Sequence, residues 1–157
     1  MTPSPHFICK HFLELSTTEL YALLKLRQEV FIVEQNCPYL DCDGKDLESY
    51  HLLCYNSEND LVAHSRLLPA GVSYDGYVSI GRVVSSAKVR GKGFGKLLLE
   101  ESLREIKLLF GEVPIKIGAQ SYLTRFYAAF GFVSTGEEYL EDGIPHTKMI
   151  LSNTKNR

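Results

Sequence analysis

Three glycines, at positions 91, 93 and 95, connect a strand pattern to a helix pattern, and this junction constrains the fold more than any other segment. The strand pattern covers residues 77–84, and the basic residues Arg90, Lys92 and Lys96 surround the glycines. Apolar residues then recur at helical spacing and would form one face of a helix: Leu99, Leu103, Ile106 and Phe110. A glycine turn that opens a helix directs backbone amides and the positive end of the helix dipole at one point. The segment therefore predicts an anion site that suits a diphosphate.

The glycine spacing fits neither of two common phosphate-binding motifs. A P-loop requires Ser or Thr after its lysine, whereas Leu97 follows Lys96 here. In G-x-G-x-x-G the third glycine would come one residue later than Gly95. The alternative interpretation is a surface turn in which the glycines only satisfy backbone geometry.

The remaining patterns predict one domain over residues 1–157. Ser16 and Glu19 form a capping box that starts a helix running to Phe31, and a short helix is expected from Leu123 to Phe130. Strands are expected at residues 6–12, 51–55, 61–68, 77–84, 114–120, 132–139 and 146–151. This order combines hairpins with a strand–loop–helix–strand crossover, which predicts a mixed sheet with helices on its faces.

Composition narrows the classes of partner and compartment. A net charge of −2 gives no electrostatic reason to expect nucleic acid, and no segment has the ~18 apolar residues of a membrane span. The first residues lack the pattern of a signal peptide. No C-x-x-C pair occurs among Cys9, Cys37, Cys42 and Cys54, so we expect reduced, buried thiols and a cytoplasmic protein.

Several segments together resemble a known family. Arg90-x-x-Gly93-x-Gly95 resembles the acetyl-CoA signature of the GNAT acetyltransferases, R/Q-x-x-G-x-G/A. Residues 80–84 (IGRVV) and 126–132 (FYAAFGF) are similar to the family's fourth strand and its F-Y-x-x-x-G-F motif. Residues 27–39, 41–46, 118–120 and 141–146 resemble the ElaA-like branch. The resemblance implies an α/β (α+β) fold of GNAT type, with a mostly antiparallel, twisted sheet, helices on both faces and a splayed strand pair.

The resemblance also implies acetyl-CoA as the acyl-donor cosubstrate. Its diphosphate is expected on the backbone of the loop, at Arg90, Gly91, Lys92, Gly93, Phe94, Gly95 and Lys96. Arg82, Val83 and Val84 are the expected cofactor-binding residues of the strand, with Val83 and Val84 pairing with the pantetheine arm as an added strand. An amide in the gap between the splayed strands would donate to the oxyanion.

For the chemistry, the resemblance implies Tyr127 as the acid that protonates the leaving thiolate; the alternative is a core aromatic. The fourth strand lacks the glutamate that many GNAT enzymes use as base. Glu34 and His146 are the candidate bases, with His51 as a further option. Each could instead be a solvated or structural group.

The loop 39–48 carries Asp41, Asp43, Asp46 and Glu48. These carboxylates could attract a cationic amine, or they could form a solvated surface. Neither the spacing in residues 41–46 nor the cysteines fit a calcium or zinc site, so we expect no metal.

These observations predict transfer of an acetyl group from acetyl-CoA to a primary amine of a small molecule. Two alternatives stay open: a protein lysine or N-terminus as acceptor, and a non-catalytic acyl-CoA-binding or sensing module. We expect neither nucleic acid nor a membrane as partner, and a homodimer is left open.

Overall fold

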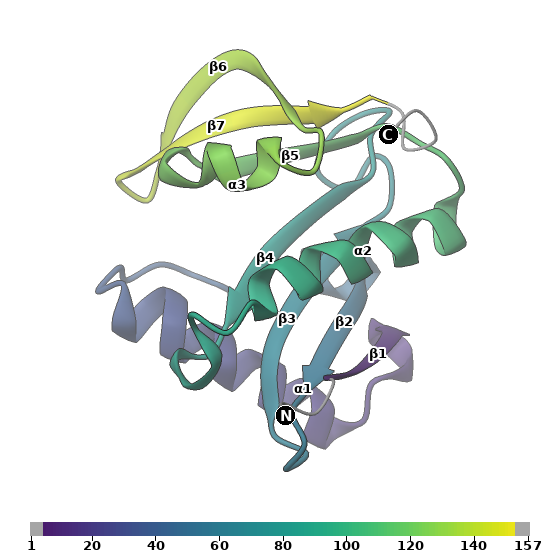
Figure 1. Cartoon of the computed structure of the whole chain (residues 1–157), viewed down its shortest axis with the longest axis vertical. Helices are drawn as coiled ribbons and strands as arrows, with labels where there is room; N and C mark the ends of the chain where they lie inside the picture. The colour runs from purple at the N-terminus through teal and green to yellow at the C-terminus, as the bar shows by residue number, and fades with distance from the viewer. Residues whose placement is uncertain (1–4, 153–157) are drawn as a thin grey trace.

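A computed structural model describes residues 5–152, so the first four and the last five residues of the predicted domain lie outside the described range. The order of elements agrees with the order predicted from the sequence (Figure 1). The strands are β1 (His6–His11), β2 (Tyr50–Tyr55), β3 (Leu61–Leu68), β4 (Ser79–Ser85), β5 (Ile115–Gln120), β6 (Val133–Glu141) and β7 (Ile144–Leu151). The α-helices are α1 (Thr17–Arg27), α2 (Phe94–Phe110) and α3 (Thr124–Ala128).

The strands form two antiparallel sheets that meet at one point. The first sheet has the order β1-β2-β3-β4 and the second the order β5-β7-β6. They are joined by a parallel bridge between Val78 and Ile115, where the Lys116 amide donates to the Val78 carbonyl at 2.9 Å. Beyond this bridge β4 and β5 separate, as Figure 1 shows. The mixed, mostly antiparallel fold with a splayed strand pair is thereby confirmed.

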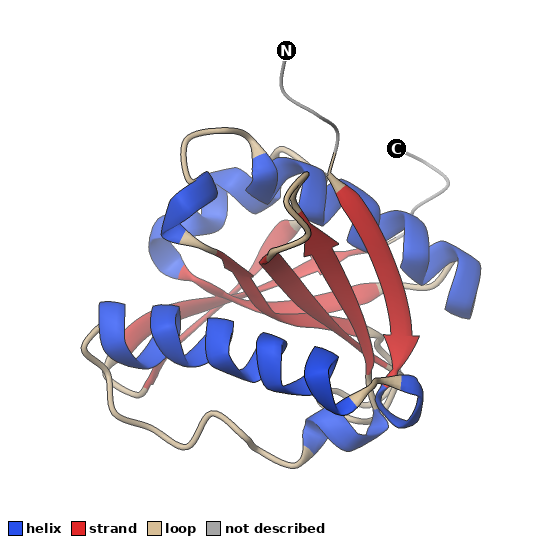
Figure 2. Ribbon diagram, turned by 90° about the horizontal axis from the view of Figure 1, so that it is seen from below, coloured by secondary structure: helices blue, strands red, loops and turns tan. Residues whose placement is uncertain are grey.

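Helices cover both faces of the first sheet (Figure 2). Successive side chains of a strand point to opposite faces of the sheet, so the neighbouring residues Ser65 and Arg66 of β3 contact the elements on either face. The Ser65 hydroxyl lies 2.7 Å from the Ser102 hydroxyl of α2, whereas the Arg66 guanidinium reaches the loop that follows α1. The two faces of the sheet therefore pack against different elements: α2 on one, and on the other the segment that runs from α1 to Asp43.

The main core lies between α2 and the strands around the junction. The predicted helix face is buried at Leu99, Leu103 and Ile106, while Phe110 packs on the core at its edge. Burial of each such side chain stabilises the fold by about 1.5–3 kcal/mol. This packing fixes α2, and therefore the glycine loop, relative to β4.

The first helix begins as predicted and ends differently. The Ser16 hydroxyl accepts from the Glu19 amide at 3.0 Å, and the Glu19 carboxylate accepts from the Ser16 amide at 2.8 Å. After Arg27 the chain continues as a π-helical segment, Gln28–Glu34. Such segments are rare and often occur at functional sites. The sequence pattern did not indicate this change of helix type.

None of the described helices is long and apolar enough to cross a membrane. The four cysteines are unpaired thiols. Cys54 is buried and Cys9 and Cys37 are half-buried, but Cys42 is exposed, so the expectation of buried thiols is wrong at that position. Cys42 is exposed because it lies in the loop after the π-helical segment, between two aspartates that turn inward.

Candidate active site

A cleft of about 810 Å³ lies between β4 and β5. It exists because the two strands are held together at Val78 and Ile115 and diverge beyond them. Seven of the residues predicted to be functional line it: Glu34, Arg82, Val83, Val84, Arg90, Tyr127 and His146. Residues distant in the sequence therefore meet in one cavity, as the resemblance implied.

The edge of β4 that faces the cleft is free of backbone partners from the described strands beyond Val78. A bulge interrupts its other edge: the pairing with β3 shifts between His64 and Arg66, and Arg82 has a φ of 48°. Such bulges turn the side chains of a strand and occur near active sites. The bulge turns Arg82 towards Asp41 and Asp43, and the free edge offers backbone groups to an extended ligand.

The glycine loop joins β4 to α2 through a 3-10 turn, Ala87–Val89. Gly93 is the residue before the helix; its φ of 82° favours glycine, and it provides no side-chain cap. The first amides of α2 therefore have no partner within the helix. Arg90 lines the cleft, whereas Gly91 to Lys96 do not.

Arg90 forms an ion pair with Glu34, the last residue of the π-helical segment. A second nitrogen of its guanidinium donates to the Ser85 carbonyl at 3.0 Å. The predicted anion-binding arginine and a candidate base are therefore partners of each other. This pairing makes Glu34 less available to accept a proton from an amine.

Tyr127 belongs both to the core and to the cleft. Its ring packs edge-to-face with Phe126 and Phe132, at centroid distances of 5.2 and 6.0 Å, and only 7% of the residue is exposed. The same residue lines the cleft. Burial, with a smaller effect from Tyr122, raises the pKa of Tyr127 to about 12. The hydroxyl is therefore protonated at neutral pH and can donate a hydrogen bond.

His146 is held in one orientation at the end of β7 that pairs with Gln120. Its Nδ1 lies 2.7 Å from the Ile144 carbonyl, and its ring stacks on Tyr139 at 5.4 Å. Because a carbonyl only accepts, Nδ1 carries the proton and Nε2 of the neutral ring has a free lone pair. Nε2 lies 3.6 Å from a Glu141 carboxylate oxygen. The geometry leaves Nε2 able to accept a proton.

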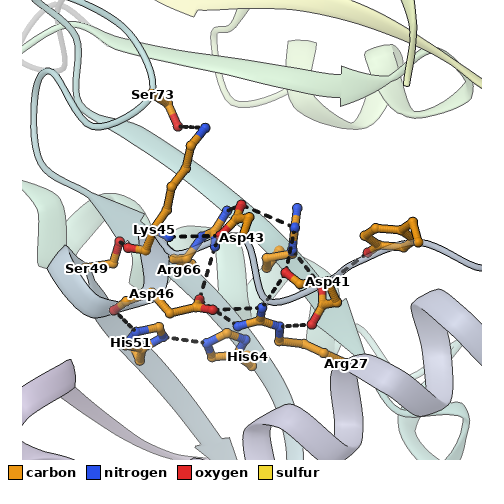
Figure 3. A network of polar contacts seen from close by, with 12 residues as sticks. Arg27, Asp41, Asp43, Lys45, Asp46, Ser49, His51, His64, Arg66 and Ser73 are labelled. Carbon is orange, nitrogen blue, oxygen red and sulfur yellow. Dashed lines mark hydrogen bonds and ion pairs between the residues drawn. The ribbon is translucent and has the colours of Figure 1, made fainter. Parts of the chain in front are cut away.

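The acidic loop is neutralised by arginines, as Figure 3 shows. Arg27, with no exposed surface, lies 2.8 Å from carboxylate oxygens of both Asp41 and Asp46. Arg66 binds Asp43 through two nitrogens at 2.8 and 3.0 Å and also contacts Asp46 at 3.1 Å. Arg82 contacts Asp41 at 2.8 Å and Asp43 at 3.3 Å.

This arginine–aspartate network corrects both interpretations of the acidic loop. Asp41 and Asp46 are buried and paired, so they are neither a solvated surface nor free to attract an amine. Burial alone would raise the pKa of Asp43, but hydrogen bonds and charge from Arg66 outweigh it and lower the pKa to about 2. Asp43 and Glu48 are both exposed, and of the four only Glu48 lies outside the network.

His51 is buried against the arginine–aspartate network and does not reach the cleft. Its Nε2 lies 3.0 Å from the Asp46 carbonyl, and its Nδ1 lies 3.1 Å from Nε2 of His64. Both rings are fully buried, and burial lowers the pKa of both histidines. His51 does not line the cleft, so the structure gives no support to it as a base.

Comparison with known proteins agrees with this architecture. The sequence model of the family described as "Acetyltransferase (GNAT) domain" matches residues 29–153. The chain belongs to the GNAT acetyltransferase family. Protein ElaA of Escherichia coli is 44% identical over 141 residues, which cover 88% of this chain and 91% of that protein. The GNAT fold and the ElaA-like branch are thereby confirmed.

Two solved structures are also similar. The crystal structure of an acyl-CoA N-acyltransferase from Pseudomonas aeruginosa has a TM-score of 0.89 and 45% identity, covering 95% of this chain and 100% of that one. The crystal structure of Escherichia coli ElaA has a TM-score of 0.85 and 41% identity, covering 94% and 99%. These similarities extend over nearly the whole GNAT domain.

Several cleft residues were missed by sequence reasoning. Tyr74 and Tyr139 meet above Gly118, where a Cβ atom would lie 3.4 Å from the Tyr74 hydroxyl and would collide with that of Tyr139. Tyr39 and Lys45 come from the loop after the π-helical segment. No short motif connects these positions, and only the fold brings them to one GNAT cleft. Within residues 5–152, no group of three or more His, Cys, Asp or Glu side chains is arranged to hold a metal ion.

Proposed function

We propose that this protein transfers the acetyl group of acetyl-CoA to the primary amine of a small molecule. One observation carries the proposal: a proton donor, Tyr127, and a proton acceptor, His146, line the same cleft as the free edge of β4. Membership of the GNAT family supports acyl-CoA as the donor. Direct transfer needs these features together: a site for an extended donor, an acid and a base.

The residues present fit acetyl-CoA, which supplies an activated thioester. The uncapped amides at the start of α2, with Lys92 and Lys96 beside them, would hold the diphosphate. The backbone of Val83 and Val84 would pair with the pantetheine arm along the free edge of β4. Arg82 would contribute through its backbone only, since Asp41 and Asp43 hold its guanidinium. A free β4 amide would donate to the developing oxyanion.

His146 is the base in this proposal. The amine nitrogen attacks the thioester carbon, a C–N bond forms, and the proton of the amine moves to Nε2 of His146 as the C–S bond breaks. Glu141, 3.6 Å from Nε2, stabilises the resulting imidazolium. Glu34 stays the second candidate, but its ion pair with Arg90 favours a role at the glycine loop.

Tyr127 assists the departing thiolate. Complete transfer of a proton from a hydroxyl of pKa about 12 to a thiolate of pKa ~8.5 would cost about 5 kcal/mol. Tyr127 therefore acts chiefly by donating a hydrogen bond to the sulfur, and the proton released from the amine later neutralises the thiolate. The buried ring keeps the hydroxyl protonated over the working range of pH.

A cytoplasmic location remains part of the proposal. The four cysteines are unpaired thiols, and such thiols persist in reducing compartments. This supports the location predicted from the sequence.

The experiment is an acceptor panel assayed by release of free CoA thiol. We expect slow release without an acceptor and faster release with small primary amines. Faster release only with peptides would indicate the protein-acetylating alternative. Binding of acetyl-CoA, seen as thermal stabilisation, without acceptor-dependent release would contradict the enzyme and support the sensing module.

A further inference from the structure

The cationic side chains that line the cleft are not equally neutralised. Arg66, Arg82 and Arg90 each form an ion pair with a carboxylate. Lys45, in the same cleft, is half-buried, and within residues 5–152 its Nζ has one hydrogen bond, to the Ser73 hydroxyl at 3.1 Å. Figure 3 shows this side chain pointing away from the aspartates towards Ser73. Lys45 therefore has a positive charge that no described carboxylate balances.

The neighbouring arginine–aspartate network has no free negative charge that could balance Lys45. Arg27, Arg66 and Arg82 face Asp41, Asp43 and Asp46, three cations against three anions, in direct contacts of 2.8–3.3 Å. Each carboxylate already has at least one guanidinium partner. An anion that enters this part of the cleft would therefore find Lys45 and the Ser73 hydroxyl as its free donors.

Lys45 and Ser73 lie near the closed end of the cleft. Ser73 belongs to the loop that leads into Val78, where the two sheets are joined. The other end, where β4 and β5 are farthest apart in Figure 1, holds the β6–β7 turn. There Glu141 and Asp142 are exposed, and His146 pairs with Gln120 at the end of β5. The cleft is thus cationic at its closed end and anionic beside His146.

We propose that the acceptor is an amino carboxylic acid whose carboxylate binds Lys45 and Ser73 while its amine lies beside His146, Glu141 and Asp142. The inference rests on the proposed function and deepens it by naming the substrate class. A zwitterion matches both ends of the cleft, since its ammonium meets carboxylates at the open end and releases one proton to solvent before the neutral amine attacks. A simple amine would leave the Lys45 charge uncompensated, and a diamine would face it with a second cation.

The wall between the two ends is continuous. Tyr74 follows Ser73, its hydroxyl meets that of Tyr139 over Gly118, and Tyr139 stacks on His146 at 5.4 Å. The Nζ atoms of Lys116 and Lys148 lie 5.0 and 5.6 Å from the centroid of the Tyr74 ring. The faces of the two tyrosine rings suit the methylene or backbone part of an amino acid. This arrangement explains why both charged ends belong to one binding site.

The test compares matched acceptors in the thiol-release assay. Lysine is compared with lysinamide and with cadaverine, and α-amino acids and ω-amino acids are each compared with their carboxamides. We expect kcat/KM to be roughly ten- to a hundredfold higher for the free carboxylates, the range of a hydrogen bond to a charged group. Lys45→Met should remove this preference by raising KM for the carboxylates, and Lys45→Arg should largely retain it.

The control is Lys25→Met, which changes an exposed lysine of α1 outside the cleft. It should leave every kinetic constant unchanged. Equal rates for carboxylates and amides, or a Lys45→Met variant that changes KM for acetyl-CoA instead of for the acceptor, would overturn the inference and leave the proposed function intact. Failure of every acceptor to release thiol would instead overturn the proposed function, and the inference with it.

Discussion

Arg90 and Glu34 form an ion pair that joins the glycine loop to the end of the π-helical segment. Both side chains line the cleft, and they are separated by 56 residues in the sequence. Both are about two-fifths exposed, so solvent weakens the pair without removing it. The pair connects the expected diphosphate site with the wall of the acceptor site.

The first prediction concerns Glu34. Its carboxylate neutralises Arg90, so Glu34→Gln should free one positive charge for the diphosphate. We expect the Kd of acetyl-CoA to fall by roughly two- to fivefold at low salt, the range of a partly exposed ion pair, with the difference fading at high ionic strength. Calorimetric titration at two salt concentrations measures it. The pH–rate profile should keep its position; a displaced profile would instead make Glu34 the base. Glu29→Gln, in the same π-helical segment but outside the cleft, is the control.

The second prediction concerns the glycine loop. Gly93 has a positive φ, so a side chain there would strain the backbone even without ligand. Gly95 is a better position, because it lies in α2 and an added Cβ would meet only the Phe126 ring, at 4.0 Å. Gly95→Val should keep the thermal stability of the free protein and abolish its stabilisation by acetyl-CoA. Glu100→Val, on the exposed face of the same helix, should keep that stabilisation. A full thermal shift in Gly95→Val would move the diphosphate site elsewhere.

The third prediction concerns Tyr127. Tyr127→Phe removes the hydroxyl and keeps the ring packed on Phe126 and Phe132. We expect kcat to fall by roughly 10²–10³-fold, the range for removing one hydrogen-bond donor to a developing negative charge, with little change in the affinity for acetyl-CoA. Steady-state kinetics with a saturating acceptor measure the effect. Tyr122→Phe, an exposed tyrosine that also lines the cleft, should change kcat little. A loss below threefold would return Tyr127 to a purely structural role.

The fourth prediction concerns the arginine–aspartate network. Asp46→Asn removes the charge that faces both Arg27 and Arg66 and leaves buried guanidinium groups undercompensated. Breaking a buried ion pair from one side typically costs about 3–5 kcal/mol, and we expect that loss in the free energy of unfolding by urea. Glu112→Gln, which breaks the exposed pair with Lys107, should cost less than about 1 kcal/mol. Equal losses in the two variants would contradict a structural role for the network.

Sequence reasoning succeeded where the determining residues are close together in the chain. The capping box of Ser16 and Glu19, the apolar face of α2 and the Arg90 motif each lie within one or a few turns. Strand and helix patterns, and the motif that resembles the GNAT signature, depend on such local spacing. For the same reason the sequence indicated the order of elements and seven of the residues that line the cleft.

Sequence reasoning failed where two interacting residues are far apart in the chain or where the backbone geometry is irregular. Arg82 and Asp41 are 41 residues apart, and nothing in the acidic loop indicates that its carboxylates turn inward to meet arginines. The bulge at Arg82 and the π-helical segment are likewise set by tertiary packing. The free charge of Lys45 emerges only once every other pair is known. Local patterns therefore indicated seven residues that line the cleft, and the charge balance of the candidate site required the structure.

The last prediction concerns pH and the buried histidines. Burial lowers the pKa of His51 and lowers that of His64 well below its ordinary value. Below about pH 6.5 the unfolded chain takes up protons that the folded chain does not, so stability is greatest above that pH and falls as the pH drops. A histidine that is protonated in the unfolded chain and unprotonated in the folded protein contributes about 1.4 kcal/mol per pH unit to this slope. Asp43, with a pKa lowered to about 2, contributes separately, from about pH 4 downward.

We therefore expect the free energy of unfolding, measured by urea titration between pH 6 and 4.5, to fall steadily in the wild-type protein. His51 Nε2 faces the Asp46 carbonyl and so carries the proton of the neutral ring, which makes His51 Nδ1 the acceptor of its 3.1 Å contact with His64 Nε2. In His64→Gln the amide can still donate to this Nδ1, but the side chain no longer titrates. The slope of the unfolding free energy against pH should decrease by the contribution of about one bound proton, whatever the stability of the variant at pH 7. His6→Gln, at an exposed position of β1, should keep the wild-type slope. If His64→Gln also keeps it, His64 is protonated in the folded protein, and the buried pair must then hold a charge beside Arg27 and Arg66.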